Sequence, residues 1–367
     1  MPAVPRNTMI ANTMTNPALA PDTVARQASD AAFQAQMLDG VSRTFALTIP
    51  QLPPDLHPVV SNAYLLCRII DTIEDEPALD FAAKRRFSES FLRAVIGDEP
   101  AERFAAALSP LLSDATLPTE RELIRETPRV LAITHGFTPT QRDALSTCVR
   151  VMGAGMVQFQ ENKDARGLAN LAAMDRYCYH VAGVVGEMLT RLFCEHSPGI
   201  ARHRDLLMRL SVSFGQGLQM TNILKDIWAD LSRGACWLPR DIFAQAGFDL
   251  SNLGPSAYNP AFGQGLSTLV ANAHGHLRNA VRYTLLIPPH ESGIRNFCLW
   301  AIGLAILTLR KIYRRPEFSS GDEVKITRRS VKATVIASRI AAGHDVAIRL
   351  LFRLAGAGIP LTRMEID

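Results

Sequence analysis

Two clusters of carboxylates are notable among the 367 residues because each lies inside a long apolar stretch with helical spacing. The first cluster contains Asp71, Glu74 and Asp75. The second contains Asp226 and Asp230, which are four residues apart like Asp71 and Asp75. Residues four apart lie on one face of a helix, so each pair presents its charges together. Such charges repel, and burying them beside apolar residues is costly unless a cation neutralises them.

The donor atoms of both clusters are oxygens, and this restricts the metal. Neither cluster contains cysteine or histidine, so a hard cation, Mg²⁺ or Mn²⁺, is expected rather than zinc. Mg²⁺ keeps part of its water shell and shares phosphate oxygens, so two facing clusters could hold a diphosphate. The alternative, that each cluster is a solvated helix end, is not excluded by one cluster alone.

Further polar residues extend the same two helix faces. Tyr64 and Arg68 precede the first cluster, while Gln219 and Asn222 precede the second. The planar guanidinium of Arg68 is suited to gripping phosphate oxygens in pairs. A salt bridge to Asp71 would account for Arg68 without any ligand.

The elements that must position these residues are predicted to be helices. From about Ala31 onward, apolar residues recur at three- and four-residue spacing, with Pro and Gly collected between the periodic stretches. Two stretches, 201–229 and 291–314, are apolar nearly all round, which indicates helices at the centre of a bundle. The predicted helices are 31–48, 56–75, 80–96, 100–114, 119–134, 138–162, 170–196, 201–229, 239–247, 264–286, 291–314 and 326–355.

This pattern predicts an all-α fold in a single helical domain over 31–355. Residues 1–30 are rich in Ala, Pro, Thr and Asn and are expected to form a disordered N-terminal tail, and 356–367 a C-terminal tail. No linker long enough to separate two domains interrupts the helical pattern.

Composition restricts the partners and the compartment. The net charge is +4, and basic and acidic residues are interspersed, so nucleic-acid binding is not expected. The six cysteines are scattered and lie mostly in apolar runs, which favours a reducing cytoplasm. The apolar run 297–309 is shorter than the roughly 20 residues of a membrane span. We expect neither a signal peptide nor a transmembrane helix, and leave a peripheral membrane contact and the oligomeric state open.

Several segments, taken in order, resemble the squalene/phytoene synthase family. The segment 41–45 (VSRTF) resembles its S-R-[ST]-F motif, and 64–75 its first aspartate-rich motif, in the D-T-I-E-D form typical of squalene synthases. The segment 219–230 resembles the second aspartate-rich motif. Shorter similarities occur at 152–156, 177–186, 237–239, 296–298 and 324–326.

The resemblance implies an isoprenoid-synthase-like helical bundle around a central cavity. It also implies condensation of two farnesyl diphosphates through presqualene diphosphate to squalene, with Mg²⁺-assisted ionisation and reduction by NADPH. Dehydrosqualene or phytoene synthesis, or an enzyme that stops at presqualene diphosphate, remain alternatives. A non-enzymatic alternative is a helical scaffold that binds prenyl lipids. A terpene cyclase would not explain the S-R-T-F segment or Tyr177 to Gly183.

Roles follow from the resemblance, position by position. Tyr177 corresponds to the tyrosine assigned to proton transfer, and Phe45 and Phe297 could face carbocations, although buried aromatic residues are more often simply core. The metal ligands implied are Asp71, Glu74, Asp75, Asp226 and Asp230. The diphosphate contacts are Ser42, Arg43, Arg68, Tyr64, Gln219, Asn222 and Arg233, with Arg43 also assigned to catalysis. The NADPH contacts are Asn222, Lys225 and Lys325.

Three positions depart from the family pattern. An arginine usually stands where this chain has Ala235, and Arg233 is the nearest replacement. Lys225 stands where many members have arginine, which keeps the charge but loses the planar fork. The basic residues around Lys325 are also spaced differently, so the pattern supports NADPH use less directly than condensation.

Overall fold

The computed structural model describes residues 21–42, 44–161, 164–254 and 258–366. The described residues form helices and contain no strand, only an isolated bridge between Leu168 and Pro239. In the first part of the chain the helices are α1 (Pro21–Val41), α2 (Phe45–Thr48), η1 (Ile49–Gln51), α3 (Leu56–Asp75), α4 (Phe81–Ile96), α5 (Ala101–Leu108), η2 (Ser109–Leu111), α6 (Pro118–Arg125), α7 (Thr127–His135) and α8 (Pro139–Glu161).

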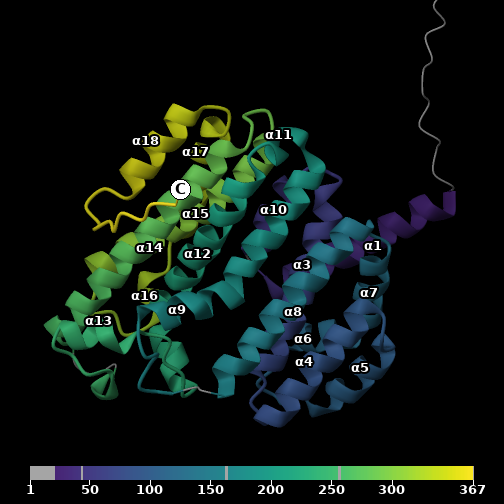
Figure 1. Ribbon diagram of the computed structural model, residues 1–367, viewed down its shortest axis with the longest axis horizontal. Helices are drawn as coiled ribbons and strands as arrows, with labels where there is room; N and C mark the ends of the chain where they lie inside the picture. Colours follow the sequence, from purple (N-terminus) through teal and green to yellow (C-terminus); the bar gives the residue numbers. More distant parts are fainter. Residues whose placement is uncertain (1–20, 43, 162–163, 255–257, 367) are drawn as a thin grey trace, which may run out of the picture.

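The second part continues the bundle. Its helices are α9 (Leu171–Cys178), the π-helical η3 (Tyr179–Gly183), α10 (Val184–His196), α11 (Pro198–Ala201), α12 (Arg204–Ser232), α13 (Arg240–Gln245), η4 (Leu250–Asn252), α14 (Pro260–Leu286), α15 (Ser292–Arg314), α16 (Gly321–Val324), α17 (Arg328–Ala341) and α18 (Asp345–Ala355). In Figure 1, α1 and α3 to α8 occupy one side of the molecule, and α13 to α18 the other. The prediction of an all-α bundle is confirmed.

Most predicted helices occur, but several are divided. The stretch predicted at 119–134 breaks between α6 and α7, where Pro128 cannot donate a backbone hydrogen bond. The stretch predicted at 326–355 breaks at Gly343 into α17 and α18. The stretch predicted at 170–196 contains a π-helical turn, η3. Helix α1 starts at Pro21, so the helical chain begins before the expected boundary at residue 31.

Helix α12 lies at the centre of the second part of the bundle. It packs against α10, η3, α14 and α15, and in Figure 1 it lies between α10 and α14. Buried residues occur around its whole circumference, as expected for a central helix. The two apolar clusters of the core both reach this helix, one through Leu210 and Phe214 and the other through Met220 and Ile223.

Helix α15 is a further central element. It is long and apolar enough to cross a membrane, and 61% of its apolar window is buried against other helices. The sequence-based expectation of a buried helix around 297–309 agrees with this packing. All six cysteines are buried and unpaired, as expected from their scattered positions.

The C-terminal segment is packed along α14 rather than projecting from the bundle. The amide of Thr362 donates to the carbonyl of Ala271 at 3.0 Å, and the guanidinium of Arg282 donates to the carbonyl of Ile366 at 2.9 Å. The ring of His274 is 2.9 Å from the carbonyl of Pro360. These contacts hold the segment against the outer side of α14.

Arg295 ties three elements of this region together and is the largest fully buried side chain. It donates to the carbonyls of Ile287 (2.7 Å) and Ala342 (2.9 Å) and pairs with Asp345 at 2.8 Å. It therefore joins the end of α14 and the start of α15 to the turn between α17 and α18.

We expect Arg295→Met to lower the free energy of unfolding by about 2–4 kcal/mol, because two buried carbonyls lose their partner. Arg314→Met, an exposed arginine on the same helix, should change it by less than about 0.5 kcal/mol. Chemical denaturation followed by circular dichroism measures both. Equal effects for the two variants would contradict the role given to Arg295.

Candidate active site

The two acidic clusters lie at corresponding places, the C-terminal ends of α3 and α12. Arg233, just after α12, connects them: its guanidinium is 2.6 Å from Asp230 Oδ1 and 4.0 Å from Asp75 Oδ1. The two clusters, which are more than 150 residues apart in the chain, therefore face each other across one arginine side chain. They are not separate solvated helix ends on distant surfaces.

The first cluster is strongly perturbed by burial. Burial, with the charges of Asp75 and Glu120, raises the pKa of Asp71 to about 7 despite the opposing charge of Arg68. Burial also raises the pKa of Glu74 to about 8, although the Gln160 side chain donates to its carboxylate at 2.8 Å. These carboxylates lie where the ionised form is costly unless more positive charge is close by.

The second cluster is partly neutralised by its own neighbours. Asp230 is buried, and burial raises its pKa although Arg233 donates to it. Asp226 is half-buried and lies 3.1 Å from the ammonium of Lys225. Both clusters lie at helix C-termini, where the helix dipole has its negative end. This partial charge further destabilises the ionised carboxylates.

The donor set fits a hard cation. The carboxylates offer only oxygens, and raised pKa values at Asp71 and Glu74 indicate charge that a cation would relieve. Within the described ranges, no three acidic, cysteine or histidine side chains already converge as a complete metal site. A cation shared with phosphate oxygens and water does not require such a cage.

A cavity of about 260 Å³ adjoins the acidic clusters. Asp71, Gln219 and Asn222 belong to its lining, and the rest of its wall is almost entirely apolar. The wall is built from α3, α8, α10, α12, α14 and α15, with contributions from α2, η1 and η3, so most long helices of the bundle contribute to it. The cavity thus has a polar, acidic part and an apolar part suited to a hydrocarbon chain.

The two phenylalanines singled out from the sequence both line this cavity. Phe45, at the start of α2, lies 5.0 Å (ring centroids) from Tyr64, which is also in the wall. Phe297 on α15 is buried and packs edge-on against Phe193. Their rings are therefore placed where they could contact a bound apolar ligand.

Tyr177 on α9 is buried beside the acidic clusters, but it is outside the cavity lining. Its ring stacks on Trp237 at 4.1 Å between ring centroids and meets Phe159 edge-on. Burial, and then the charge of Glu74, raise its pKa well above the usual range, so its hydroxyl stays protonated at neutral pH. The close stack fixes the direction of the phenol.

Arg68 is engaged within the protein. Its guanidinium forms an ion pair with Glu120 on α6 and lies 3.6 Å from Asp71, while its buried Nε lacks a hydrogen-bond partner within the described chain. Ser42 accepts a hydrogen bond from the amide of Phe45 at 3.0 Å. Arg43, predicted to contact the diphosphate and to act in catalysis, lies outside the described residues.

The two lysines predicted to contact NADPH belong to neighbouring elements. Helix α16 packs on α12. The contact is close at Gly321, where an added Cβ atom would lie 3.0 Å from the carbonyl oxygen of Lys225. Lys325, at the end of α16, is exposed and pairs with Asp322 at 3.3 Å. Lys225 and Lys325 therefore belong to elements that pack against each other, and each ammonium has an aspartate beside it, Asp226 and Asp322 respectively.

Sequence reasoning missed two residues of the site, Glu120 and Gln160. Glu120 neutralises Arg68 from α6, and Gln160 holds Glu74 from the end of α8. Neither residue belongs to a motif or shares a helix with its partner. No sequence signal distinguishes them from ordinary polar residues of amphipathic helices.

Glycines allow the helices around the cavity to approach closely. If Gly215 carried a Cβ atom, that atom would lie only 2.2 Å from the carbonyl oxygen of Ala182. A Cβ atom at Gly186 would lie 2.3 Å from the carbonyl oxygen of Ser211. Helix α12 therefore contacts η3 and α10 backbone to backbone. Gly186 and Gly215 also line the cavity, so the absence of a side chain there leaves room for a ligand as well as for close packing.

The fold and the site define the class: an all-α, isoprenoid-synthase-like bundle of the prenyltransferase kind. The chain matches the family profile of squalene/phytoene synthase over residues 38–330, and it belongs to that family.

Curated relatives and solved structures agree with this assignment. Squalene synthase from Yarrowia lipolytica is 29% identical over 339 residues, covering 90% of this chain and 72% of the relative. Squalene synthase from Cyberlindnera jadinii is 29% identical over 320 residues, covering 84% and 67%. The solved complex of TcSQS with the ligand BPH1237 superposes with a TM-score of 0.70 at 23% identity, covering 89% of this chain and 98% of that one. That likeness shows the shared fold.

We expect Gly215→Ala to lower the free energy of unfolding by about 1–3 kcal/mol, because the added carbon would overlap the Ala182 carbonyl and push α12 away from η3. The matched control is Gly153→Ala on α8, where the nearest contact would be an ordinary 3.9 Å to Ser88. Gly153→Ala should leave the free energy of unfolding unchanged or raise it by up to about 1 kcal/mol, because alanine favours the helix more than glycine does. Thermal unfolding of both variants tests the contact, and an unaffected Gly215→Ala would refute it.

Proposed function

We propose that this protein condenses two molecules of farnesyl diphosphate head to head, through presqualene diphosphate, to squalene, with Mg²⁺ and NADPH as cofactors. One observation carries the proposal: the acidic ends of α3 and α12 face each other at the polar part of an apolar cavity. Such an arrangement suits a ligand with an anionic head and a long hydrocarbon tail. The squalene synthases among the curated relatives support this choice of reaction.

The polar part of the cavity would receive the diphosphate of the first substrate. Asp71, Glu74, Asp75, Asp226 and Asp230 would hold Mg²⁺, which supplies neutralisation of the leaving diphosphate as its bond to carbon breaks. Ser42, Arg43, Arg68, Tyr64, Gln219, Asn222 and Arg233 are proposed as direct contacts to diphosphate oxygens. The unpartnered Nε of Arg68 is a buried donor suited to such a contact.

The apolar part of the cavity would hold the prenyl chains and exclude water. Once the first C–O bond breaks, pyrophosphate leaves with the bonding electrons and an allylic cation remains. The double bond of the second substrate attacks that cation, and loss of a proton closes the cyclopropane of presqualene diphosphate. Phe45 and Phe297 would face the cation with their ring electrons and keep water away from it.

Tyr177 is proposed to guide the proton released in that step. Burial raises its pKa, so the phenol is held neutral. Its stack on Trp237 fixes the orientation of the phenol, close enough to Glu74 and Asp230 to feel their charges. A neutral phenol next to the carboxylates can pass a proton toward them or toward the departing pyrophosphate. Tyr177 would therefore act from the boundary between the polar clusters and the cavity.

The second half of the reaction would require a hydride. Loss of the second diphosphate and rearrangement of the carbon skeleton would leave a cation, and the chemistry that bound NADPH would supply is a hydride for that cation. Asn222 lines the cavity, and Lys225 and Lys325 lie on adjacent elements, so their charges fit the phosphates of a dinucleotide. These three residues are the proposed NADPH contacts.

The direct test is incubation of the purified protein with farnesyl diphosphate and Mg²⁺, with and without NADPH, followed by extraction and mass spectrometry. We expect squalene only when NADPH is present, and no product when EDTA removes the metal. A C30 hydrocarbon formed without NADPH would favour dehydrosqualene synthesis, and accumulation of presqualene diphosphate would favour an enzyme without the reduction. Absence of product together with Mg²⁺-independent lipid binding would favour a scaffold.

The acidic clusters have their own test. We expect Asp75→Asn and Asp226→Asn each to lower kcat/KM by about 10²–10³, because each removes charge that would neutralise the leaving group through the metal. Raising the Mg²⁺ concentration should restore part of the activity. The matched control is Asp98→Asn at an exposed loop, which should keep normal activity. Activity retained in both cluster variants would rule out this diphosphate site.

A further inference from the structure

The outer side of the helical hairpin α17–α18 exposes an unusual amount of apolar surface. On α18, Val346, Leu350 and Leu354 follow one another at four-residue spacing and are 80%, 52% and 58% exposed. On α17, Ile336 and Ile340 have the same spacing and are 61% and 73% exposed. Residues four apart share one face of a helix, so each helix carries an outward apolar stripe. In Figure 1 the two helices lie together at the outer edge of the molecule.

Charge beside these stripes is almost entirely positive. Residues 326–363 contain seven Arg and Lys residues and a single carboxylate, Asp345. That carboxylate is already neutralised, because it pairs with the buried Arg295 at 2.8 Å. On α18, Arg349 and Arg353 directly flank the apolar stripe, and both are exposed. The hairpin thus combines exposed apolar side chains with uncompensated positive charge.

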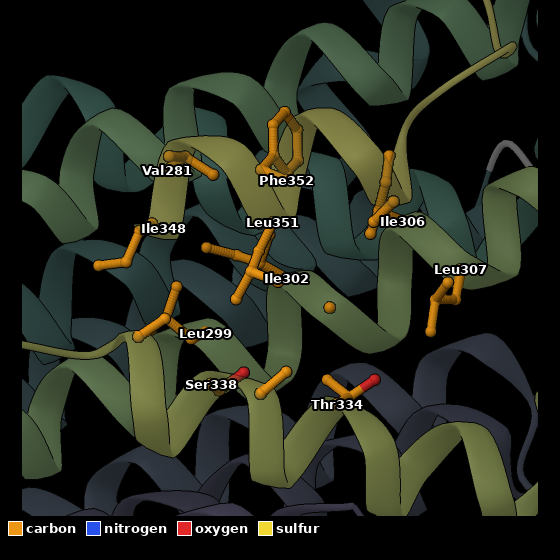
Figure 2. A pocket seen from close by; sticks show the side chains of 14 residues that line it. Val281, Leu299, Ile302, Ile306, Leu307, Thr334, Ser338, Ile348, Leu351 and Phe352 are labelled. Atoms are coloured by element: carbon orange, nitrogen blue, oxygen red, sulfur yellow. The ribbon is translucent and has the colours of Figure 1, made fainter. Parts of the chain in front are cut away.

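The surface between α18 and α14 extends the same combination. A broad cleft there has Arg278, Arg282, Arg349 and Arg353 in its lining, together with leucines and Phe352. Phe352 and Val281 also line a second, apolar pocket of about 120 Å³ beneath the hairpin. Figure 2 shows this pocket with side chains from α15, α17 and α18 around it. An arginine-lined cleft therefore adjoins an apolar recess that an acyl chain could enter.

We propose that the α17–α18 hairpin is a docking surface for an anionic lipid membrane. The apolar stripes would enter the headgroup boundary, and the arginines would bind lipid phosphates, which is the arrangement of interfacial amphipathic helices. A second copy of the chain is a poorer occupant, because a symmetric contact through this face would bring the same arginines together. The face is separate from the substrate cavity, since α15 lies between them and contributes different residues to each.

The test is flotation of the full chain with vesicles of phosphatidylcholine, alone or mixed with phosphatidylglycerol, in the absence of substrate. We expect binding to the phosphatidylglycerol vesicles that weakens as salt is added, and little binding to phosphatidylcholine alone. The double variants Leu350→Ser/Leu354→Ser and Arg349→Glu/Arg353→Glu should each reduce binding at least about tenfold. Because all four side chains are exposed, thermal unfolding should be unchanged.

Matched controls are available on α4, α5 and α8 and at the start of α6, none of which belongs to the hairpin. Ile96→Ser/Leu117→Ser removes two exposed apolar side chains there, and Arg103→Glu/Arg142→Glu reverses two exposed arginines, one on α5 and one on α8. Both should bind vesicles like the unmodified protein. Equal losses in controls and hairpin variants, or no binding to anionic vesicles, would overturn the proposal. So would a dimer in sedimentation that the hairpin variants convert to monomer without any lipid binding.

Discussion

The arrangement of the site depends on electrostatic repulsion between carboxylates at the C-terminal ends of α3 and α12. Each helix already carries partial negative charge at that end, and burial makes the ionised side chains more costly still. The raised pKa values of Asp71, Glu74 and Asp230 are the measure of this cost. Arg233 relieves part of it by pairing with Asp230 beside Asp75. The remaining excess of negative charge is the feature on which the proposed metal and diphosphate site depends.

The rest of the bundle keeps these charges in position against their repulsion. Backbone contacts at Gly186 and Gly215 bring α10, η3 and α12 closer than ordinary side chains would allow. The π-helical turn lies at this contact and follows the helix that carries Tyr177. Close packing of this kind cannot relax easily, so the carboxylates cannot separate without disturbing the core. The stability of the apolar helices thus supports a polar site that would be unfavourable alone.

Helix α15 also separates the cavity beside the acidic clusters from the pocket beneath α17 and α18. One side of this helix presents Phe297, Cys298 and Ala301 to the cavity next to the acidic clusters. Its other side presents Leu299 and Ile302 to the pocket beneath α17 and α18. The proposed substrate cavity and the proposed membrane surface therefore lie on opposite sides of the same buried helix. Apolar contacts on both sides agree with the apolar character of α15 around nearly its whole circumference.

The sequence by itself determined the helical class and most helix positions, because apolar periodicity of three and four residues is a local property. It also determined the two acidic clusters, since the four-residue spacing of Asp71/Asp75 and Asp226/Asp230 is local too. Only the tertiary structure decided that the clusters face each other and which residues hold them. Glu120 and Gln160 reach the site from other helices, so no local pattern marks them. The π-helical turn η3 likewise contains no proline and lies where α12 packs against it, whereas the break before α18 falls at Gly343, a residue that disfavours helix.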